Sequence, residues 1–228
     1  KQGESASKSM TLISLTLVLS TVLFALSPAL SGWAEGYLEE RAIYDVQINS
    51  YYNNVLRQED LPQDTYDFVP TFLEARGIQI TQDRVFSLYL PEASQFHNRN
   101  KYDFPVVAVA LSDYNAIRQM LGYPPISLGA REFSTQWDAI STPEDQAAFL
   151  RNHPTLSTDA GTLSLAQDAL HTESMGETFY NLYTHVTYVL PDQVCHQLLP
   201  VMTKRYLATA HPIPYADAAA LPALFSTH

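Results

Sequence analysis

The stretch FPVVAVALSDYNAIRQMLGYPPISL (Phe104–Leu128) decides the fold class of this 228-residue chain. Its first eight residues are almost all apolar and rich in valine, which is typical of a buried strand. Ser112 is a favourable helix N-cap, and Gly122, followed by two prolines, ends the helix that starts there. The stretch therefore predicts a strand over 104–111, a helix over 112–121 and a short strand over 126–128.

The residues before this stretch predict further strands and a second helix. YDVQIN (Tyr44–Asn49) alternates polar and apolar residues, as a half-buried strand does. DTYDFVPTFLEAR (Asp64–Arg76) is predicted to be helical and to end at Gly77. Residues 78–81 and 84–90 are predicted to form a hairpin or successive strands. The order of elements over 44–128 matches a split βαβ, ferredoxin-like subdomain in an α+β fold.

A second, smaller α+β subdomain is predicted over 129–185. TPEDQAAFL (Thr142–Leu150) has a threonine N-cap and a proline at the first helical position. YTHVTYVL (Tyr183–Leu190) alternates as a strand does, and PDQVCHQLLPVM (Pro191–Met202) is predicted to be a helix. We expect residues 186–228 to return to the first subdomain and to lead towards a next membrane span.

The N-terminal part contains an uncharged segment, MTLISLTLVLSTVLFALSPALSGW (Met10–Trp33). A helix of this length spans the hydrocarbon core of a bilayer, about 30 Å. We therefore predict a transmembrane helix over 10–33, after a cytoplasmic flank over 1–9, and a stalk helix over 34–43. Lysines precede the segment and glutamates follow it, which predicts a cell-membrane protein whose main domain is extracellular.

Other interpretations of this segment remain open. Ala29 and Ser31 form the small-x-small pattern of a secretory cleavage site. The segment could also be a buried helix of a soluble protein, although such helices seldom lack polar positions on every side. The chain starts at Lys1 and ends in the apolar stretch ADAAALPALFSTH (Ala216–His228). These ends favour a fragment of a larger membrane protein over ordinary processing or trimming.

Composition excludes several classes of protein. With 24 acidic and 13 basic residues, the formal net charge is −11. This charge excludes a nucleic-acid binder that relies on a basic surface. The single cysteine excludes a disulfide framework and a cysteine-rich zinc site. Apolar residues make up 46% of the chain, which is typical of a folded protein.

A search for catalytic motifs finds none. The chain has no G-x-S-x-G, H-E-x-x-H, P-loop or G-x-G-x-x-G motif. Cys195 and His196 are adjacent on a predicted helix and point in different directions, so they cannot pair as nucleophile and base. Cys195 is predicted to be a buried apolar residue and His185 a sheet residue. We therefore expect no catalytic, cofactor-binding or metal-binding residue, and no cofactor.

Aromatic residues give a stronger signal, because the chain has 14 tyrosines and 10 phenylalanines. Some of them could form a surface for an amphipathic peptide or a lipid, although most aromatic residues pack in a core. Tyr66, Phe68 and Phe104 are further candidates for this surface. The predicted partner surface consists of Tyr51, Tyr52, Phe96, His97, Arg99 and Tyr102.

Several segments together resemble the FtsX-like permeases of ABC transporters, a class that includes MacB-like and bacitracin-efflux permeases. They are the uncharged helix, the stalk ending in RAIYDVQI, the helix end FLEARGI, the segment LSDYNAIRQMLGYPPISL (Leu111–Leu128) and VLPDQVCHQLL (Val189–Leu199). The resemblance covers roughly residues 10–210. It implies one membrane helix and a large extracytoplasmic domain, while the remaining helices and a cytoplasmic ATPase lie elsewhere.

The resemblance also implies a function without an enzymatic centre in this chain. ATP-driven movement would be transmitted through the stalk to the outer domain, which exports or senses a peptide, lipid or lipoprotein. Expected partners are the ABC ATPase, the rest of the permease, a second permease copy and membrane lipid, but no nucleic acid. The alternatives are a membrane-anchored or secreted ligand-binding module and an extracytoplasmic hydrolase. The hypothesised coupling stalk contains Trp33, Gly36, Tyr37, Glu39, Glu40 and Arg41.

Overall fold

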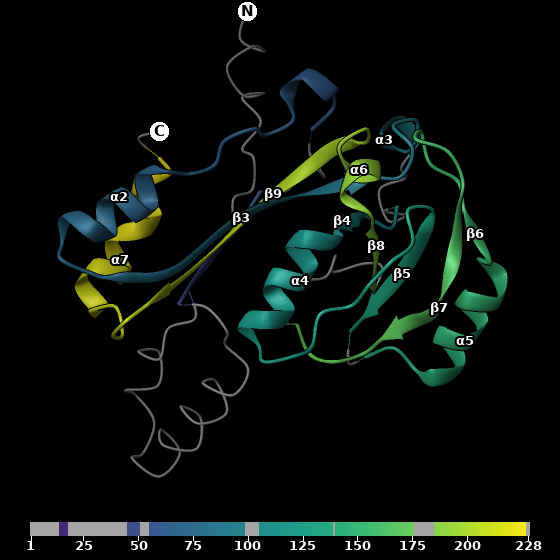
Figure 1. Cartoon of the computed structure of the whole chain (residues 1–228). Coiled ribbons are helices and arrows are strands. Elements are labelled where there is room, and N and C mark those ends of the chain that lie inside the picture. Colours follow the sequence, from purple (N-terminus) through teal and green to yellow (C-terminus); the bar gives the residue numbers. More distant parts are fainter. Residues whose placement is uncertain are drawn as a thin grey trace, which may run out of the picture. The chain divides into compact units, whose positions relative to one another are not determined.

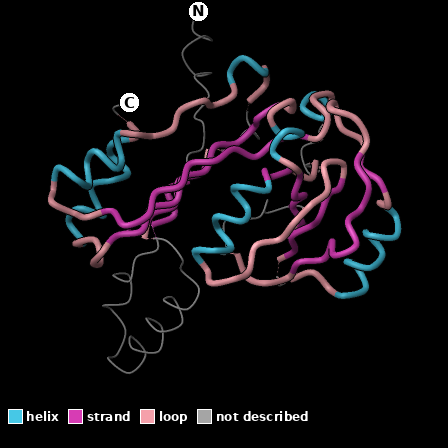
Figure 2. Tube along the Cα trace, viewed as in Figure 1, coloured by secondary structure: helices cyan, strands magenta, loops and turns pink. Residues whose placement is uncertain are grey.

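The computed structural model describes residues 14–17, 45–50, 55–98, 105–138, 140–175 and 185–226. The chain forms two compact units, unit 1 (residues 1–86 and 202–228) and unit 2 (residues 87–201). The boundaries between the units fall inside two long strands, β3 (Ile80–Leu90) and β9 (Leu199–Thr209), which are labelled in Figure 1 and drawn in magenta in Figure 2. The described residues contain both helices and a largely antiparallel sheet, so the predicted α+β class is confirmed.

Unit 1 contains an antiparallel sheet in which β9 is an inner strand. β1 (Ser14–Leu17) pairs antiparallel with β2 (Val46–Asn49), and β2 pairs antiparallel with β9. β3 lies on the other side of β9. Two hydrogen bonds, Ala210 N to Gln79 O (3.0 Å) and Thr81 Oγ1 to Ala208 O (3.1 Å), show that β3 and β9 also run in opposite directions.

It follows that β2 and β3 run in the same direction on the two sides of β9. Helix α2 (Phe68–Ala75) connects them, and α7 (Tyr215–Leu224) follows β9. Pro70 is the third residue of α2, where a helix needs no N–H donor, so the helix tolerates it. The two helices and one face of the sheet share an apolar cluster that includes Val46, Ile48, Val69, Leu73, Leu207, Ala218 and Leu221.

The side chain of Arg205 on β9 ties three parts of unit 1 together. Its Nε and Nη2 donate to the two carboxylate oxygens of Asp83 on β3, at 2.9 and 2.6 Å. Its Nη1 donates to Asp67 Oδ1 (2.6 Å), just before α2, and to the carbonyl of Thr65 (2.7 Å). The hydrogen bond from Arg205 lowers the pKa of Asp67. Arg205 is buried, so these contacts satisfy a charge that water cannot reach.

Unit 2 contains a mixed sheet in which parallel and antiparallel pairs alternate. Helices α3 (Gln95–Asn98), α4 (Leu111–Met120), α5 (Pro143–Asn152) and α6 (Asp192–Cys195) accompany it. As predicted, α5 starts after Thr142, whose Oγ1 accepts from the N–H of Asp145 (3.2 Å). The strands follow the order β3, β4 (Ala108–Ala110), β8 (Val186–Leu190), β5 (Glu132–Trp137), β7 (Leu163–His171) and β6 (Thr155–Leu156).

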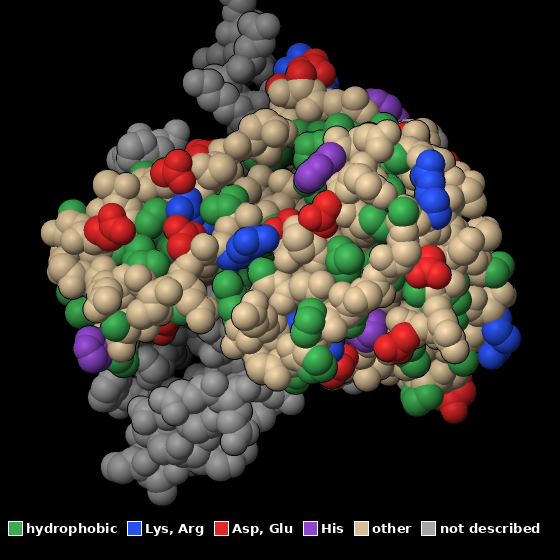
Figure 3. Space-filling view, in the orientation of Figure 1, with side chains coloured by type: hydrophobic (Ala, Val, Ile, Leu, Met, Phe, Trp, Pro, Cys, Tyr) green, Lys and Arg blue, Asp and Glu red, His purple; other side chains and the backbone are tan. Residues whose placement is uncertain are grey.

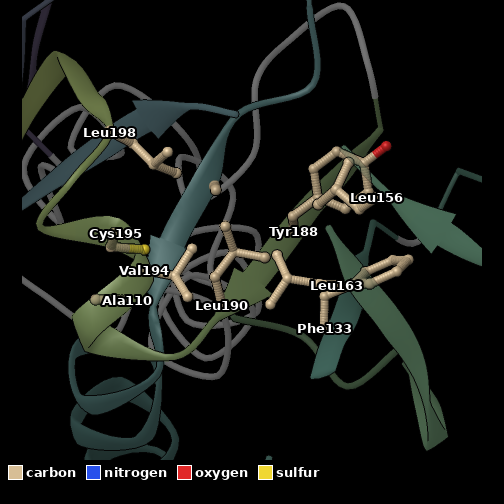
Figure 4. Close-up of a cluster of buried hydrophobic side chains, with 10 residues drawn as sticks. Ala110, Phe133, Leu156, Leu163, Tyr188, Leu190, Val194, Cys195 and Leu198 are labelled. Atoms are coloured by element: carbon tan, nitrogen blue, oxygen red, sulfur yellow. The ribbon is translucent and has the colours of Figure 1, made fainter. Parts of the chain in front are cut away.

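One side of this sheet packs into an apolar cluster, shown in Figure 4. Phe133 of β5 and Tyr188 of β8 meet edge to face, with ring centroids 5.6 Å apart. Val194 and Cys195 bring α6 to the same cluster. Cys195 is fully buried, as predicted, and burial raises the pKa of its thiol to about 12. The thiol therefore stays protonated and unreactive at neutral pH.

Four local predictions were wrong. Ser112 is not an N-cap, because α4 already begins at Leu111 with Ala110 as its N-cap, and the strand before it is only Ala108–Ala110. Residues 126–128 form no strand, because the side-chain amide of Asn115 binds the backbone N–H and C=O of Ile126, both at 2.9 Å. The helix predicted over 191–202 is only α6, and β9 begins at Leu199, where Pro200 cannot continue a helix. Residues 80–90 form one strand, because the polar residue Asp83 pairs with Arg205 and does not mark a turn.

The predicted division into subdomains also differs from the observed one. The sequence predicts the βαβ arrangement within residues 44–128 alone. In the structure, unit 1 combines residues before position 87 with residues after position 201. The predicted second subdomain, 129–185, covers only part of unit 2, which also contains β4 and α4. The physical reason is the pairing of β9 with β2 and β3, which brings distant parts of the sequence together.

Most of the predicted flank, membrane helix and stalk (residues 1–43) lies outside the described residues. The exception is Ser14–Leu17, which forms β1 where the sequence predicted helix. In β1 the backbone N–H and C=O groups of these residues pair with β2. In a helix the same groups would pair with each other. Among the helices that the structure describes, none combines the length and the apolar composition needed to cross a bilayer.

We expect Arg205→Met to lower the free energy of unfolding by about 2–3 kcal/mol, because it removes charge-assisted hydrogen bonds to two carboxylates. Urea unfolding of the full chain, followed by circular dichroism, measures this change. Arg57→Met is the matched control, since Arg57 pairs with Asp60 at an exposed site and should matter by less than about 0.5 kcal/mol. Equal effects of the two substitutions would contradict the role given to Arg205.

Candidate functional site

The candidate site lies on the side of the unit 2 sheet opposite the apolar cluster. Along β5, Ser134 and Gln136 alternate with Phe133 and Thr135, so the two pairs point to opposite faces. Gln136 is directly opposite Thr187 of β8 in the ladder. We define the polar cluster as Tyr114, Arg118, Ser134, Gln136, His171, Glu173 and Thr187.

An irregularity in β7 brings His171 into this cluster. Phe133 is paired with Leu165, but Thr135 is paired with Leu170, so β7 uses three more residues than β5 over this interval. Such a bulge changes which side chains face each side of the sheet. As a result His171 is placed beside Gln136, and Glu173 follows two residues later.

Gln136 is the centre of the hydrogen-bond network in the cluster. Its Oε1 accepts from the hydroxyl of Tyr114 on α4. Its Nε2 donates to the carbonyls of Trp137 (3.0 Å) and Glu173 (2.9 Å). Helix, strand and the segment after β7 are therefore joined through one fully buried amide.

Arg118 supplies the positive charge of the cluster. Its Nη2 donates to Glu173 Oε1 (3.0 Å), its Nη1 to the Tyr114 hydroxyl (3.3 Å) and its Nε to the carbonyl of Pro124 (2.7 Å). Only 2% of the Arg118 side chain is exposed. The hydrogen bond from Arg118 lowers the pKa of Glu173, which keeps this carboxylate ionised.

Four buried polar atoms of the cluster form no hydrogen bond to any described residue. They are Ser134 Oγ, Thr187 Oγ1, His171 Nε2 and Glu173 Oε2. A buried polar atom without a partner costs free energy, so native proteins contain few of them. Their concentration on one face distinguishes this cluster from the rest of unit 2.

The protonation state of His171 follows from its surroundings. Burial is the main cause that lowers the pKa of its imidazole, so the ring is neutral at pH 7. A hydrogen bond with the backbone of Asp168 involves the ring as well. The Nε2 atom of His171 is buried and has no hydrogen-bond partner among the described residues.

A second pair of titratable residues, Asp138 and His185, forms the next step of the β5–β8 ladder. Asp138 Oδ2 lies 2.5 Å from His185 Nδ1, and its Oδ1 accepts from the N–H groups of Ile140 (3.1 Å) and Ser141 (3.0 Å). A carboxylate that orients an imidazole occurs in general-base and metal sites. Among the described residues, however, no group of three metal-binding side chains exists.

The structure describes only two residues of the predicted partner surface. Phe96 is 2% exposed and belongs to the interior, whereas His97 is exposed beside it on α3. Phe96 is therefore not part of a surface, because its ring is the kind of side chain that burial stabilises most. Tyr51, Tyr52, Arg99 and Tyr102, Phe104 and the stalk residues Trp33 to Arg41 lie outside the described residues. Tyr66 and Phe68 pack in the core of unit 1, as most aromatic residues do.

The polar cluster was not predicted from the sequence, although the sequence contains an alternation of polar residues that could have indicated it. Polar residues occupy every second position in STQWD (Ser134–Asp138) and in HVT (His185–Thr187). In a strand this spacing places them on one face. The bulge that brings His171 to the same face has no comparable signature in the sequence.

Charged side chains on the visible surface do not gather by type. Among the coloured, described residues in Figure 3, Lys and Arg side chains are scattered between acidic and uncharged ones.

Comparison of the chain with protein-family models, with curated proteins and with solved structures finds no significant match. Functional inference therefore depends on the residues and geometry of the chain itself.

We expect stability to fall as the pH is lowered from about 7 to about 5. In this interval the unfolded chain takes up a proton on His171 that the folded chain resists, because burial lowers the pKa of His171. Thermal unfolding at a series of pH values measures the slope. His171→Gln should flatten it, whereas the exposed control His196→Gln should not. An unchanged slope in His171→Gln would show that this imidazole does not resist protonation.

Proposed function

We propose that this chain is the extracytoplasmic part of an FtsX-like ABC transporter permease, preceded by one of its membrane helices. The observation that carries the proposal is the uncharged segment Met10–Trp33 before an acidic α+β domain. The proposal requires Ser14–Leu17, which pair as β1 with β2 in the structure, to be helical in the membrane. In this role the chain couples ATP hydrolysis by a separate cytoplasmic subunit to export or sensing of a peptide, lipid or lipoprotein. The chain itself carries no ATPase activity.

The arrangement of unit 1 supports the proposal. β2, α2 and β3, with β9 between the two strands, have the connectivity of a split βαβ unit. After the predicted stalk, the first described element is β2 and the last is α7, and both belong to unit 1, while residues 87–201 form unit 2. Force applied through the stalk therefore reaches β2 first, before any residue of unit 2.

A second candidate is a membrane-anchored or secreted ligand-binding module without a role in transport. The polar cluster favours it, because four buried polar atoms on one sheet face suit a bound molecule better than a purely mechanical domain. The two candidates share the external location of the domain, and they differ in whether an ATPase responds to it.

The membrane topology can be tested by cysteine labelling, because Cys195 is buried with a raised pKa and should not react. Glu74→Cys places a thiol on an exposed part of α2, and Lys8→Cys places one before the apolar segment. We expect a membrane-impermeant maleimide to label Glu74→Cys in intact cells and Lys8→Cys only after lysis. Labelling of neither variant before lysis would contradict an extracytoplasmic domain, and the unmodified chain controls for Cys195.

The coupling role can be tested in the complete permease–ATPase complex. Two glycines inserted after Glu39 would interrupt a stiff stalk helix, because glycine destabilises helices. We expect a loss of transport and of substrate-stimulated ATPase activity. The same insertion after Gln63, an exposed residue outside the helices, is the control and should leave both intact. Normal coupling with the stalk insertion would argue against mechanical transmission through residues 34–43.

A further inference from the structure

The last part of β7 is attached to the sheet on one side only. Beyond the irregularity in β7, the residues that pair with β5 are Leu170 and His171. On the other side, β6 pairs with Leu163 and Ser164, which precede the irregularity, and no described strand pairs with the residues after it. A strand end with few partners opens at a lower free energy than the rest of its sheet. We call residues 170–175 the β7 end.

The contacts of Glu173 hold the β7 end to α4 and to β5. Nη2 of Arg118 donates to Glu173 Oε1 (3.0 Å), and Nε2 of Gln136 donates to the carbonyl of Glu173 (2.9 Å). Met175 adds an apolar side chain that is 1% exposed. The carboxylate of Glu173 is 40% exposed, so the ion pair with the buried Arg118 lies at the border with water.

His171 is the titratable group that the β7 end places in the interior. Its ring lies 6.2 Å from the ring of Tyr114 on α4, measured between centroids. The charged groups that act on it are Arg118 of α4, Asp168 of β7 and Glu173. The other cluster residues, on β5 and β8, are uncharged, namely Ser134, Gln136 and Thr187.

The closed and opened forms of the β7 end differ in their affinity for a proton. In the closed form burial is the largest influence on His171 and lowers the pKa of its imidazole. In an opened form the ring returns to water and to its ordinary pKa of about 6.5. The opened form therefore takes up the proton more readily. The closed form is favoured fully above pH 6.5 and loses this advantage as the pH falls below it.

We infer that the β7 end is an acid-operated latch, which joins β7 to β5 and α4 at neutral pH and is released when His171 takes up a proton. The latch does not depend on the transporter role proposed above, because all of its residues belong to unit 2. Glu173 is not the trigger, since the hydrogen bond from Arg118 lowers the pKa of its carboxyl and keeps it ionised in this pH range.

Hydrogen exchange of the full chain, followed by mass spectrometry at pH 7.0 and 5.5 and corrected for the intrinsic exchange rate, tests the latch. We expect the opening constant of the β7 end to rise by up to about tenfold between these pH values. At both values it should exceed the opening constant of the central strand β8, while exchange from α7 in unit 1 should not change with pH. Exchange of the β7 end that is independent of pH, or as slow as that of β8, would overturn the inference.

Two variants separate the trigger from the contacts that close the latch. His171→Gln should remove the pH dependence at the β7 end, because an amide takes up no proton in this range, whereas the exposed control His196→Gln should retain it. Glu173→Gln should raise opening already at pH 7.0, because it leaves the buried charge of Arg118 without its carboxylate. A pH dependence that persists in His171→Gln would show that another group operates the latch. If His171→Gln does not fold, the wild-type measurement decides by itself.

Discussion

The alternation of side chains along β5 is the constraint on which unit 2 depends. Phe133 turns into the apolar cluster of Figure 4, while Ser134 and Gln136 turn to the opposite face. Side chains along a strand point alternately to its two faces. A shift of β5 by one residue would therefore move Phe133 out of the apolar cluster and Gln136 out of the polar cluster at the same time. Gln136 then joins β5 to α4 and to the segment after β7 with hydrogen bonds that water cannot replace.

Unit 1 follows a different principle, because a single charged side chain connects its elements. Arg205 projects from β9 and binds Asp83 on β3 and Asp67 before α2. The apolar cluster on the same strand supplies most of the burial, but apolar contacts are not directional. The guanidinium fork adds direction, because it matches the two oxygens of a carboxylate only in one geometry. The register of β3 beside β9 is therefore specified by polar contacts.

The polar cluster bears on both functional candidates. A mechanical domain needs rigid strands, and hydrogen bonds centred on Gln136 and Arg118 provide rigidity. A ligand-binding module needs polar atoms that are not already satisfied, and Ser134, Thr187 and His171 provide those. An extracytoplasmic permease domain that senses its substrate would use both properties. Asp138 and His185 form a hydrogen-bonded carboxylate–imidazole pair. No nucleophile among the described residues is assigned to this pair.

The sequence by itself determined the α+β class and the elements that depend on neighbouring residues. The N-cap at Thr142, the buried thiol of Cys195 and the strand after His185 could be read from local pattern, because caps and alternation act over a few residues. Tertiary structure alone decided that Asp83 lies within a strand, that β9 completes the sheet of unit 1, and that a bulge turns His171 towards Gln136. These features arise from partners up to about 160 residues apart in the sequence, and contacts between such distant partners leave no periodic pattern in the chain.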